Sequence, residues 1–161
     1  MLILNSGGTF NKRYNSINGE LEVPFDNNAL ESILQSANHI YPLAGVVYKD
    51  SLDMTLDDRS KLANIIREAE ENTFIVIHGT DTMHLSAAFF SEVFDDKIII
   101  LTGSMVPFEI DNIEASFNLG MAIGFSKAML KPGVYICMSG LIEKFDLLEK
   151  NRTLGKFEFV K

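Results

Sequence analysis

The segment from Phe74 to Met83 reads F-I-V-I-H-G-T-D-T-M and contains the alternation on which the fold of this chain depends. Its four leading apolar residues are typical of a strand that is covered on both faces of a sheet. The polar turn 78–82 ends this strand, and helical spacing follows from Met83 to about Phe94. A buried strand, a hydroxyl-rich turn and a helix are therefore predicted in succession.

The same alternation recurs along the chain. Short, nearly continuous apolar runs predict five strands, at Met1–Leu4, Gly45–Tyr48, Phe74–Ile77, Ile98–Leu101 and Val134–Met138. Apolar side chains three and four positions apart predict helices at Leu30–Ala37, Leu62–Ala69, Met83–Phe94 and Ile113–Met129. Strands that alternate with helices favour a three-layer α/β fold, in which helices flank a largely parallel sheet.

Two local patterns complete this outline. Thr55 stands three residues before Asp58 at the start of the second helical region, which resembles a capping box. The stretch from Phe10 to Pro24 has no clear periodicity apart from a predicted turn at Asn18-Gly19, so we expect a long loop that acts as a lid or is disordered. No internal repeat interrupts the chain, and a single domain over residues 1–161 is expected.

Composition excludes several classes of protein. The 14 Lys and Arg residues are scattered and are outnumbered by 22 Asp and Glu, so we expect no nucleic-acid partner. No apolar run approaches the roughly 18 residues of a membrane span, and the start of the chain lacks the pattern of a signal peptide. The single cysteine, Cys137, lies in an apolar run and is expected to be a buried, inert thiol. These features indicate a cytoplasmic protein without a membrane partner.

Turns that carry hydroxyl groups follow four of the five predicted strands. They are Asn5–Thr9, Asp50–Ser51, His78–Thr82 and Thr102–Ser104. Because the carboxyl ends of parallel strands lie along one edge of a sheet, we expect these turns to face a common crevice. Their glycines permit close backbone approach, and hydroxyls beside helix starts favour anionic groups.

Each turn also has a purely structural explanation. Thr80, Asp81 and Thr82 are natural N-cap residues, and His78 is expected to be a packed, hydrogen-bonded histidine. His39 and His84 have no partner at metal-ligand spacing, so neither a metal nor another cofactor is expected. What favours a site is the coincidence of four such turns at one edge.

The residue types in the crevice are compatible with acyl transfer. No G-x-S-x-G elbow is present, so threonines are the candidate nucleophiles, with Asp81 and a lysine as partners. A desolvated lysine can accept a proton, and backbone N–H groups of a glycine-rich turn can stabilise an oxyanion. Spacing alone does not select this chemistry over simple ligand binding.

Four segments of the chain resemble the signature segments of the bacterial-type L-asparaginase/glutaminase family. They are Asn5–Phe10, Asp50–Thr55, His78–Met83 and Leu101–Pro107. Their order and approximate spacing match over nearly the whole chain, and H-G-T-D-T beside a G-G-T turn is a specific signal. The resemblance implies the flavodoxin-like or Rossmann-like N-terminal domain of that family. It also implies an amidohydrolase that converts L-asparagine, or a related small amide, to the acid and ammonia.

Roles for individual residues follow from the resemblance alone. It implies that Thr9 is the nucleophile, that Thr80 is the second catalytic threonine, and that Asp81 and Lys150 complete its relay. Tyr14 would match the tyrosine of a mobile lid. The expected substrate-binding residues are Gly8, Ser51 for the α-carboxylate, Gly79, Asp81 for the α-ammonium, and Ser104 on the oxyanion side. Leu52 departs from the family, in which a polar residue often touches the substrate.

Members of that family are about twice as long, so the chain resembles their N-terminal catalytic domain without the C-terminal domain. The C-terminal domain supplies oligomer contacts and helps to finish the pocket. Two alternatives to a minimal amidohydrolase therefore stay open. One is a small-amino-acid binding or regulatory domain with little or no turnover, and the other is an ammonia-releasing subunit of an amidotransferase-type complex. We expect a homo-oligomer, or a partner chain that completes the site, because an absent domain leaves apolar surface to be covered.

Overall fold

The computed structural model describes residues 1–128 and 131–160. Its main sheet has the strand order β4-β1-β5-β6-β7-β8, and every neighbouring pair is parallel except β7 and β8. The strands of this sheet are β1 (Leu2–Gly7), β4 (Leu43–Lys49), β5 (Thr73–Ile77), β6 (Ile98–Thr102), β7 (Gly133–Met138) and β8 (Leu141–Lys144). The predicted α/β fold with a largely parallel sheet is confirmed.

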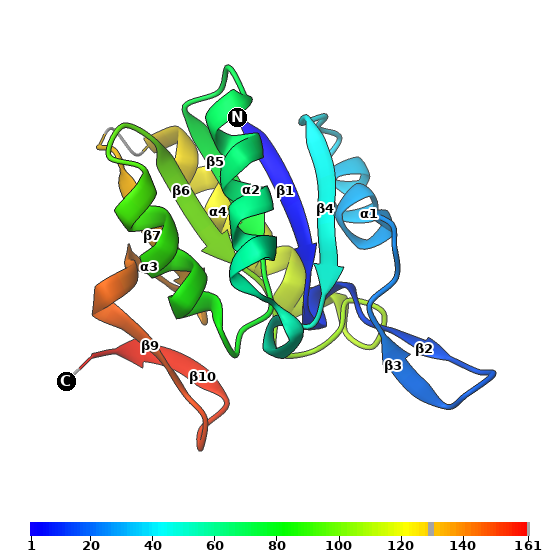
Figure 1. Cartoon of the computed structure of the whole chain (residues 1–161). Coiled ribbons are helices and arrows are strands. Elements are labelled where there is room, and N and C mark those ends of the chain that lie inside the picture. Colours follow the sequence, from blue (N-terminus) through cyan, green and yellow to red (C-terminus); the bar gives the residue numbers. More distant parts are fainter. Residues whose placement is uncertain (129–130, 161) are drawn as a thin grey trace.

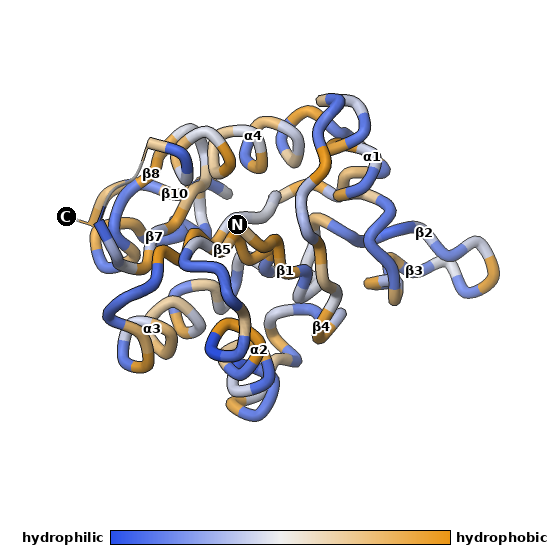
Figure 2. Tube along the Cα trace, turned by 90° about the horizontal axis from the view of Figure 1, so that it is seen from above, coloured by the Kyte–Doolittle hydropathy of each residue, from blue (hydrophilic) through white to orange (hydrophobic). Residues whose placement is uncertain are grey.

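Helices cover both faces of the sheet, as Figure 1 shows from the side and Figure 2 from above. On one face lie α2 (Leu56–Glu68) and α3 (Met83–Val93), and on the other lie α1 (Asn28–Ser36) and α4 (Asn112–Ala128). Each face has its own apolar core, centred on the fully buried Phe74 and Phe90 in one and on Ile75 and Leu119 in the other. The predicted end of the fourth helix, Met129, lies outside the described residues.

All five predicted strands are present, and four of them are closely packed. The exception is β4, whose residues are half-buried or exposed because it lies at the edge of the sheet with only β1 beside it. The capping box is also confirmed. The Thr55 hydroxyl accepts from the Asp58 N–H at 3.3 Å, and Asp58 Oδ2 accepts from the Thr55 N–H at 2.9 Å.

The order of the parallel strands places a crevice at a defined point. The chain passes from β1 to β4 on one side and then returns across β1 to β5 on the other. Connections therefore leave the carboxyl ends of β1 and β5 toward opposite faces, which is the switch point where open α/β sheets bind ligands. The turns that begin at Gly7 and at His78 follow these two strands.

The stretch from Phe10 to Pro24 is not the irregular loop that its sequence predicted. After a short 3-10 turn (η1, Thr9–Asn11), β2 (Arg13–Asn15) and β3 (Glu20–Glu22) form an antiparallel hairpin that projects from the body of the molecule (Figure 1). Gly19, at the predicted turn, has φ +78°. The hairpin had no apolar signature because its two strands are short, mostly exposed and mainly polar.

A second hairpin follows the main sheet and was not predicted. After η3 (Phe145–Leu147), it consists of β9 (Leu148–Asn151) and β10 (Lys156–Phe159). Leu148 and Phe157 are buried in the same apolar core as α3, so the hairpin is anchored against the domain. Among the described residues, no helix has both the length and the apolar character needed to cross a membrane.

Candidate active site

The four hydroxyl-bearing turns meet at the predicted edge of the sheet, with backbones so close that only glycine fits. A Cβ atom on Gly8, where φ is +79°, would lie 2.4 Å from the backbone nitrogen of Gly79. A Cβ atom on Gly79 would lie 2.6 Å from Cβ of Ser51, and one on Gly103 would lie 2.4 Å from the His78 carbonyl oxygen. The turns after β1, β4, β5 and β6 therefore form one contiguous surface.

Lys150 reaches this surface from β9. Its Nζ donates to Thr80 Oγ1 at 2.7 Å and to Asp81 Oδ1 at 3.0 Å, and its side chain is only 13% exposed. The three side chains expected to form a relay are thus in direct contact, although Lys150 is far from the other two along the chain. They line a pocket of about 200 Å³, whose full lining is Thr80, Asp81, His84, Glu149, Lys150, Arg152 and Phe157.

Arg152 is a member of this pocket that sequence reasoning missed. Its Nη1 donates to Asp81 Oδ1 at 2.7 Å and its Nη2 to the Asp81 carbonyl oxygen at 3.2 Å. No sequence pattern pointed to it, because Arg152 lies in the turn between β9 and β10, beyond the end of β9 at Asn151, and its contact with Asp81 depends on how the hairpin packs. Asp81 therefore already contacts two cations through Oδ1, and the 64% exposed Arg152 would compete with a ligand ammonium for this carboxylate.

Ser51 provides an unsatisfied polar group beside the pocket turn. It is 2% exposed, and its Oγ has no hydrogen-bond partner among the described residues. A buried hydroxyl without a partner is costly, so this atom is suited to bind a polar group of a ligand. Asp50, next to it, pairs with Lys12 at 2.6 Å. Burial by itself would raise the pKa of Asp50, but the hydrogen bond from Lys12 and that from the Leu52 N–H hold this pKa below its ordinary value.

The remaining expected site residues lie near the pocket or away from it. Thr9 follows Gly8 on the turn that touches Gly79, but it is not part of the pocket lining around Thr80. Ser104 is buried, and its hydroxyl donates to the Val106 carbonyl oxygen within its own turn at 2.6 Å. Tyr14 lies on the β2–β3 hairpin with 61% of its surface exposed, and the structure does not bring it into this pocket.

His78 is a buried, hydrogen-bonded histidine, as predicted. Its Nδ1 lies 2.7 Å from the Gly79 carbonyl oxygen, and its Nε2 lies 2.7 Å from Ser86 Oγ. Because a carbonyl can only accept, Nδ1 carries the proton and Nε2 accepts from the serine. Burial, together with the nearby charge of Arg59, lowers the pKa of His78 to about 4, so the ring is neutral at pH 7.

Two further expectations concern Thr82 and Cys137. Thr82 is the N-cap residue of α3, but its side chain does not cap the helix and donates instead to the Ser51 carbonyl oxygen at 2.7 Å. Cys137 is a buried free thiol, and burial raises its pKa to about 12, so it is inert as predicted. Among the described residues, no group of three or more His, Cys, Asp and Glu side chains is arranged to hold a metal ion.

Known proteins are similar to this chain in sequence. The family model described as Asparaginase, N-terminal matches residues 1–155. The L-asparaginase of Thermococcus kodakarensis is 30% identical over 137 residues, which cover 74% of this chain and 42% of that protein. One component of the glutamyl-tRNA(Gln) amidotransferase of Methanococcus vannielii is 27% identical over 150 residues, covering 88% of this chain and 34% of that protein.

Solved structures show the same fold. The thermostable L-asparaginase from Thermococcus kodakarensis superposes with a TM-score of 0.83 at 24% identity, covering 99% of this chain and 50% of that one. A probable cytoplasmic L-asparaginase from Campylobacter jejuni superposes with a TM-score of 0.75 at 20% identity, covering 99% of this chain and 57% of that one. The chain spans less than half the length of the two relatives matched by sequence, the L-asparaginase of Thermococcus kodakarensis and the amidotransferase component of Methanococcus vannielii. With a family model that matches residues 1–155, an asparaginase-like fold and the signature turns in contact, this chain belongs to the asparaginase N-terminal domain family.

Proposed function

We propose that this protein is an amidohydrolase that releases ammonia from the side-chain amide of L-asparagine or of a related small amide. The observation that carries the proposal is the contact of Lys150 Nζ with both Thr80 Oγ1 and Asp81 Oδ1 at the switch point of the sheet. A lysine held between a hydroxyl and a carboxylate is a suitable acceptor and donor of protons for acyl transfer. Membership of the asparaginase family supports the same reaction class.

In the proposed first step, the Thr9 hydroxyl adds to the amide carbon and gives up its proton, which is passed to the amide nitrogen. The amide nitrogen takes up a proton and leaves as ammonia, which forms an ester between the substrate acyl group and Thr9. Ser51 would bind the α-carboxylate of the substrate, and Asp81 would bind its α-ammonium in place of Arg152. The close approach of the Gly8 and Gly79 turns supports a shared site for Thr9 and Thr80.

In the proposed second step, a water molecule adds to the ester carbon. Thr80 accepts a proton from this water as it passes its own hydroxyl proton to the Lys150–Asp81 pair. The ester bond then breaks, Thr9 regains its proton, and the acid leaves. The overall reaction consumes one amide and one water and yields one carboxylic acid and one ammonia.

The test is the release of ammonia from L-asparagine, L-glutamine and simple amides by the purified chain. We expect turnover by the wild type and its loss in Thr9→Ala and in Thr80→Ala. Equal rates in the wild type and in Thr9→Ala would refute the proposed nucleophile. No release from any of these amides would refute the proposed reaction.

A second candidate is supported by a specific contact. Arg152 occupies the carboxylate that would bind the substrate ammonium, which favours a domain that binds small amino acids with little turnover. Saturable thermal stabilisation by L-aspartate without ammonia release would support this alternative. The similarity to a component of an amidotransferase suggests a third candidate, an ammonia-supplying subunit, for which a copurifying second protein is the expected result.

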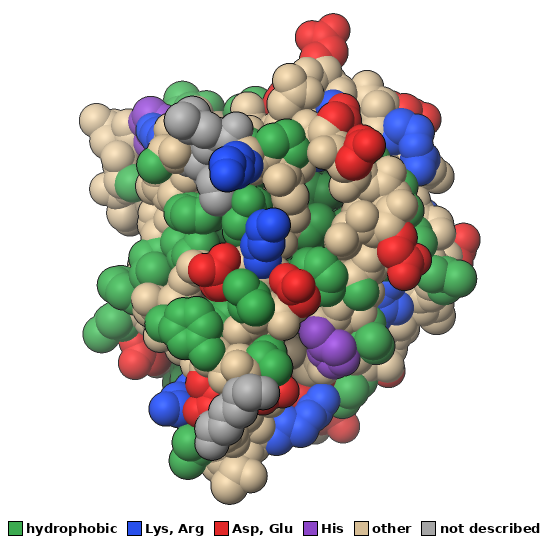
Figure 3. Space-filling model, turned by 90° about the vertical axis from the view of Figure 1, so that its left-hand side faces the viewer, with side chains coloured by type: hydrophobic (Ala, Val, Ile, Leu, Met, Phe, Trp, Pro, Cys, Tyr) green, Lys and Arg blue, Asp and Glu red, His purple; other side chains and the backbone are tan. Residues whose placement is uncertain are grey.

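We further propose a cytoplasmic homo-oligomer, or a complex in which a partner chain completes the pocket. The side of the molecule that includes the β9–β10 hairpin displays hydrophobic side chains among charged ones (Figure 3). Exposed apolar residues in these C-terminal elements are Leu147, Leu154, Phe159 and Val160. Exposed apolar surface of this kind favours association, and light scattering that shows a monodisperse monomer would contradict the homo-oligomer.

A further inference from the structure

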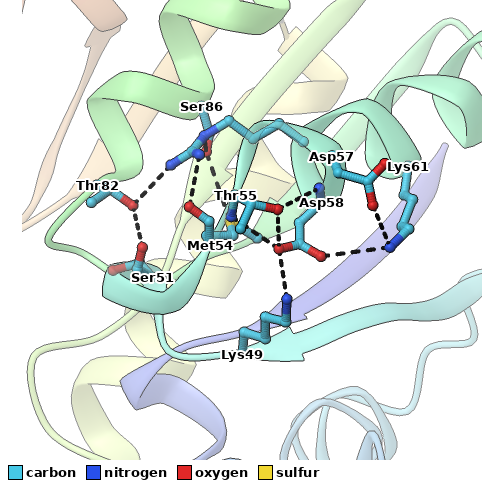
Figure 4. Close-up of polar contacts among 10 residues, drawn as sticks. Lys49, Ser51, Met54, Thr55, Asp57, Asp58, Lys61, Thr82 and Ser86 are labelled. Carbon is cyan, nitrogen blue, oxygen red and sulfur yellow. Dashed lines mark hydrogen bonds and ion pairs between the residues drawn. The ribbon is translucent and has the colours of Figure 1, made fainter.

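Arg59, on α2, is a buried cation behind the candidate active site that none of the proposed chemical steps uses. The whole residue is 7% exposed, and its guanidinium makes three hydrogen bonds. Nε donates to Ser86 Oγ at 2.9 Å, Nη1 to the Met54 carbonyl oxygen at 3.0 Å, and Nη2 to Thr82 Oγ1 at 3.2 Å (Figure 4). Burial of a charge is unfavourable unless it is compensated, so its position calls for an explanation.

The first chain of hydrogen bonds runs from Arg59 to the turn that carries Ser51. Because Thr82 Oγ1 accepts from the guanidinium, its own hydrogen is directed to the Ser51 carbonyl oxygen, 2.7 Å away. Met54, at the other end of the same short turn (η2, Ser51–Asp53), accepts directly from Nη1. Arg59 therefore fixes both ends of the turn that presents the unpartnered Ser51 hydroxyl.

The second chain runs from Arg59 to the turn that carries Thr80. Ser86 Oγ accepts from Arg59, so its hydrogen is directed to His78 Nε2 at 2.7 Å. The His78 Nδ1–H then donates to the Gly79 carbonyl oxygen at 2.7 Å. Since arginine can only donate, the direction of every bond in both chains is set at Arg59.

The charge of Arg59 is also left without a direct carboxylate partner. The neighbouring Asp58 contacts Thr55, Lys49 at 2.7 Å and Lys61 at 3.8 Å instead (Figure 4), although its negative charge still acts on the guanidinium. Among the described residues, no ion pair includes Arg59. A positive charge two hydrogen bonds behind Ser51 would be compensated by an anionic group bound at that serine.

We propose that Arg59 is a positioning residue that fixes the Ser51 and Gly79 turns relative to each other and selects ligands with a carboxylate at Ser51. This inference rests on the proposed function for the place of the carboxylate. It assigns the selection to a buried residue that does not touch the substrate. The two chains can be tested separately, because Thr82 belongs only to the first, and Ser86 belongs to the second and touches the first only through a 3.9 Å contact with Met54 Sδ.

The test begins with ligand binding, which does not depend on turnover. L-Aspartate and 3-aminopropanoate differ only in the α-carboxylate, and calorimetry gives the affinity of each. We expect Arg59→Met and Thr82→Val to weaken L-aspartate binding about tenfold or more and to change 3-aminopropanoate binding less than threefold. Arg59→Lys, which keeps the charge, should recover part of the loss. Arg67→Met is the matched control, since Arg67 is an exposed arginine on the same helix and should leave both affinities unchanged.

Kinetics then separate the two chains. With L-asparagine, Thr82→Val should mainly raise KM and Ser86→Ala should mainly lower kcat, while Arg59→Met should do both. With 3-aminopropanamide, which lacks the carboxylate, the KM effect of Thr82→Val should disappear. Circular dichroism shows whether each variant is folded.

Three results would overturn the inference. They are wild-type affinity for L-aspartate in a folded Arg59→Met, equal losses for ligands with and without the carboxylate, and no binding of L-aspartate to the wild type. A different result identifies failure of the proposed function alone. In that case L-aspartate binding depends on Arg59, but the wild type releases no ammonia from any amide.

Discussion

Replacement of Lys150 by methionine is the sharpest test of the candidate active site. The change keeps the length and the apolar stem of the side chain, but removes the ammonium that donates to Thr80 Oγ1 and Asp81 Oδ1. General acid–base groups contribute about 10²- to 10⁴-fold to a rate, so we expect amide hydrolysis to fall by about that factor. Substrate binding should change less, because Ser51 and Asp81, the groups proposed to bind the substrate, are both retained.

The cost to stability should be small by comparison. The lost pair is only partly buried, and Asp81 keeps its contact with Arg152, so we expect a loss of about 1–2 kcal/mol in the free energy of unfolding. For a chain of this size, that corresponds to a fall in Tm of about 3–6 °C. A large loss of activity with a small fall in Tm would therefore point to chemistry and not to unfolding.

Lys156→Met is the matched control for this experiment. Lys156 lies on the partner strand β10, is 52% exposed and has only a 3.9 Å ion pair with Glu158. We expect its activity and its Tm to remain close to those of the wild type. Ammonia release and thermal unfolding monitored by circular dichroism give both quantities. If Lys150→Met keeps wild-type activity, or if Lys156→Met loses as much, the relay centred on Lys150 is wrong.

Three other perturbations have defined outcomes. Gly8→Ala should lower the free energy of unfolding, measured by urea titration, by at least about 3 kcal/mol and abolish turnover, since the new Cβ would meet Gly79 at a backbone conformation that favours glycine. Gly155→Ala, which has open space around it, is the control and should cost only about 1 kcal/mol. Arg152→Gln should strengthen binding of L-aspartate relative to succinate several-fold, because it frees Asp81 for an ammonium, and unchanged relative affinity by calorimetry would contradict this competition. The pKa of His78 is about 4 in the folded protein, below the ordinary 6.5, so the unfolded chain binds a proton at this residue at higher pH than the folded one. The free energy of unfolding should therefore fall by up to about 3 kcal/mol as pH falls from about 6.5 toward 4. Urea unfolding across that range should show the loss in the wild type and little of it in His78→Gln.

The parts of the fold that the sequence predicts are those governed by local pattern. The apolar run at Phe74–Ile77 and the helical spacing after Met83 both gave elements within one residue of their observed limits. The two hairpins escaped prediction because their strands are only three or four residues long: those of the first are mainly polar and exposed, and those of the second are held by the buried anchors Leu148 and Phe157. Pattern-based interpretation detects periodicity, and a strand of three or four residues has almost none.

The same distinction applies to the site. Thr80 and Asp81 could be placed at the edge of the sheet because they follow a strand, whereas the position of Lys150 rested on a resemblance and its contacts on tertiary structure. Arg59 was missed for a different reason. On a helix whose spacing predicts an amphipathic surface, an arginine is ordinarily an exposed residue, and nothing in its neighbours indicates that its side chain turns inward to Ser86 and Thr82.

The contact between Lys150 and Thr80 depends on how firmly the β9–β10 hairpin is held. The lysine reaches the pocket from a two-stranded sheet outside the main sheet, so its place is not fixed by the parallel strands that position Thr80. What fixes it is the burial of Leu148, two positions before it, and of Phe157, directly opposite it in the register. Phe157→Ala should therefore displace Lys150 and lower turnover well beyond its effect on binding, while the parallel sheet remains folded. Full activity in that variant would mean that the lysine has another anchor.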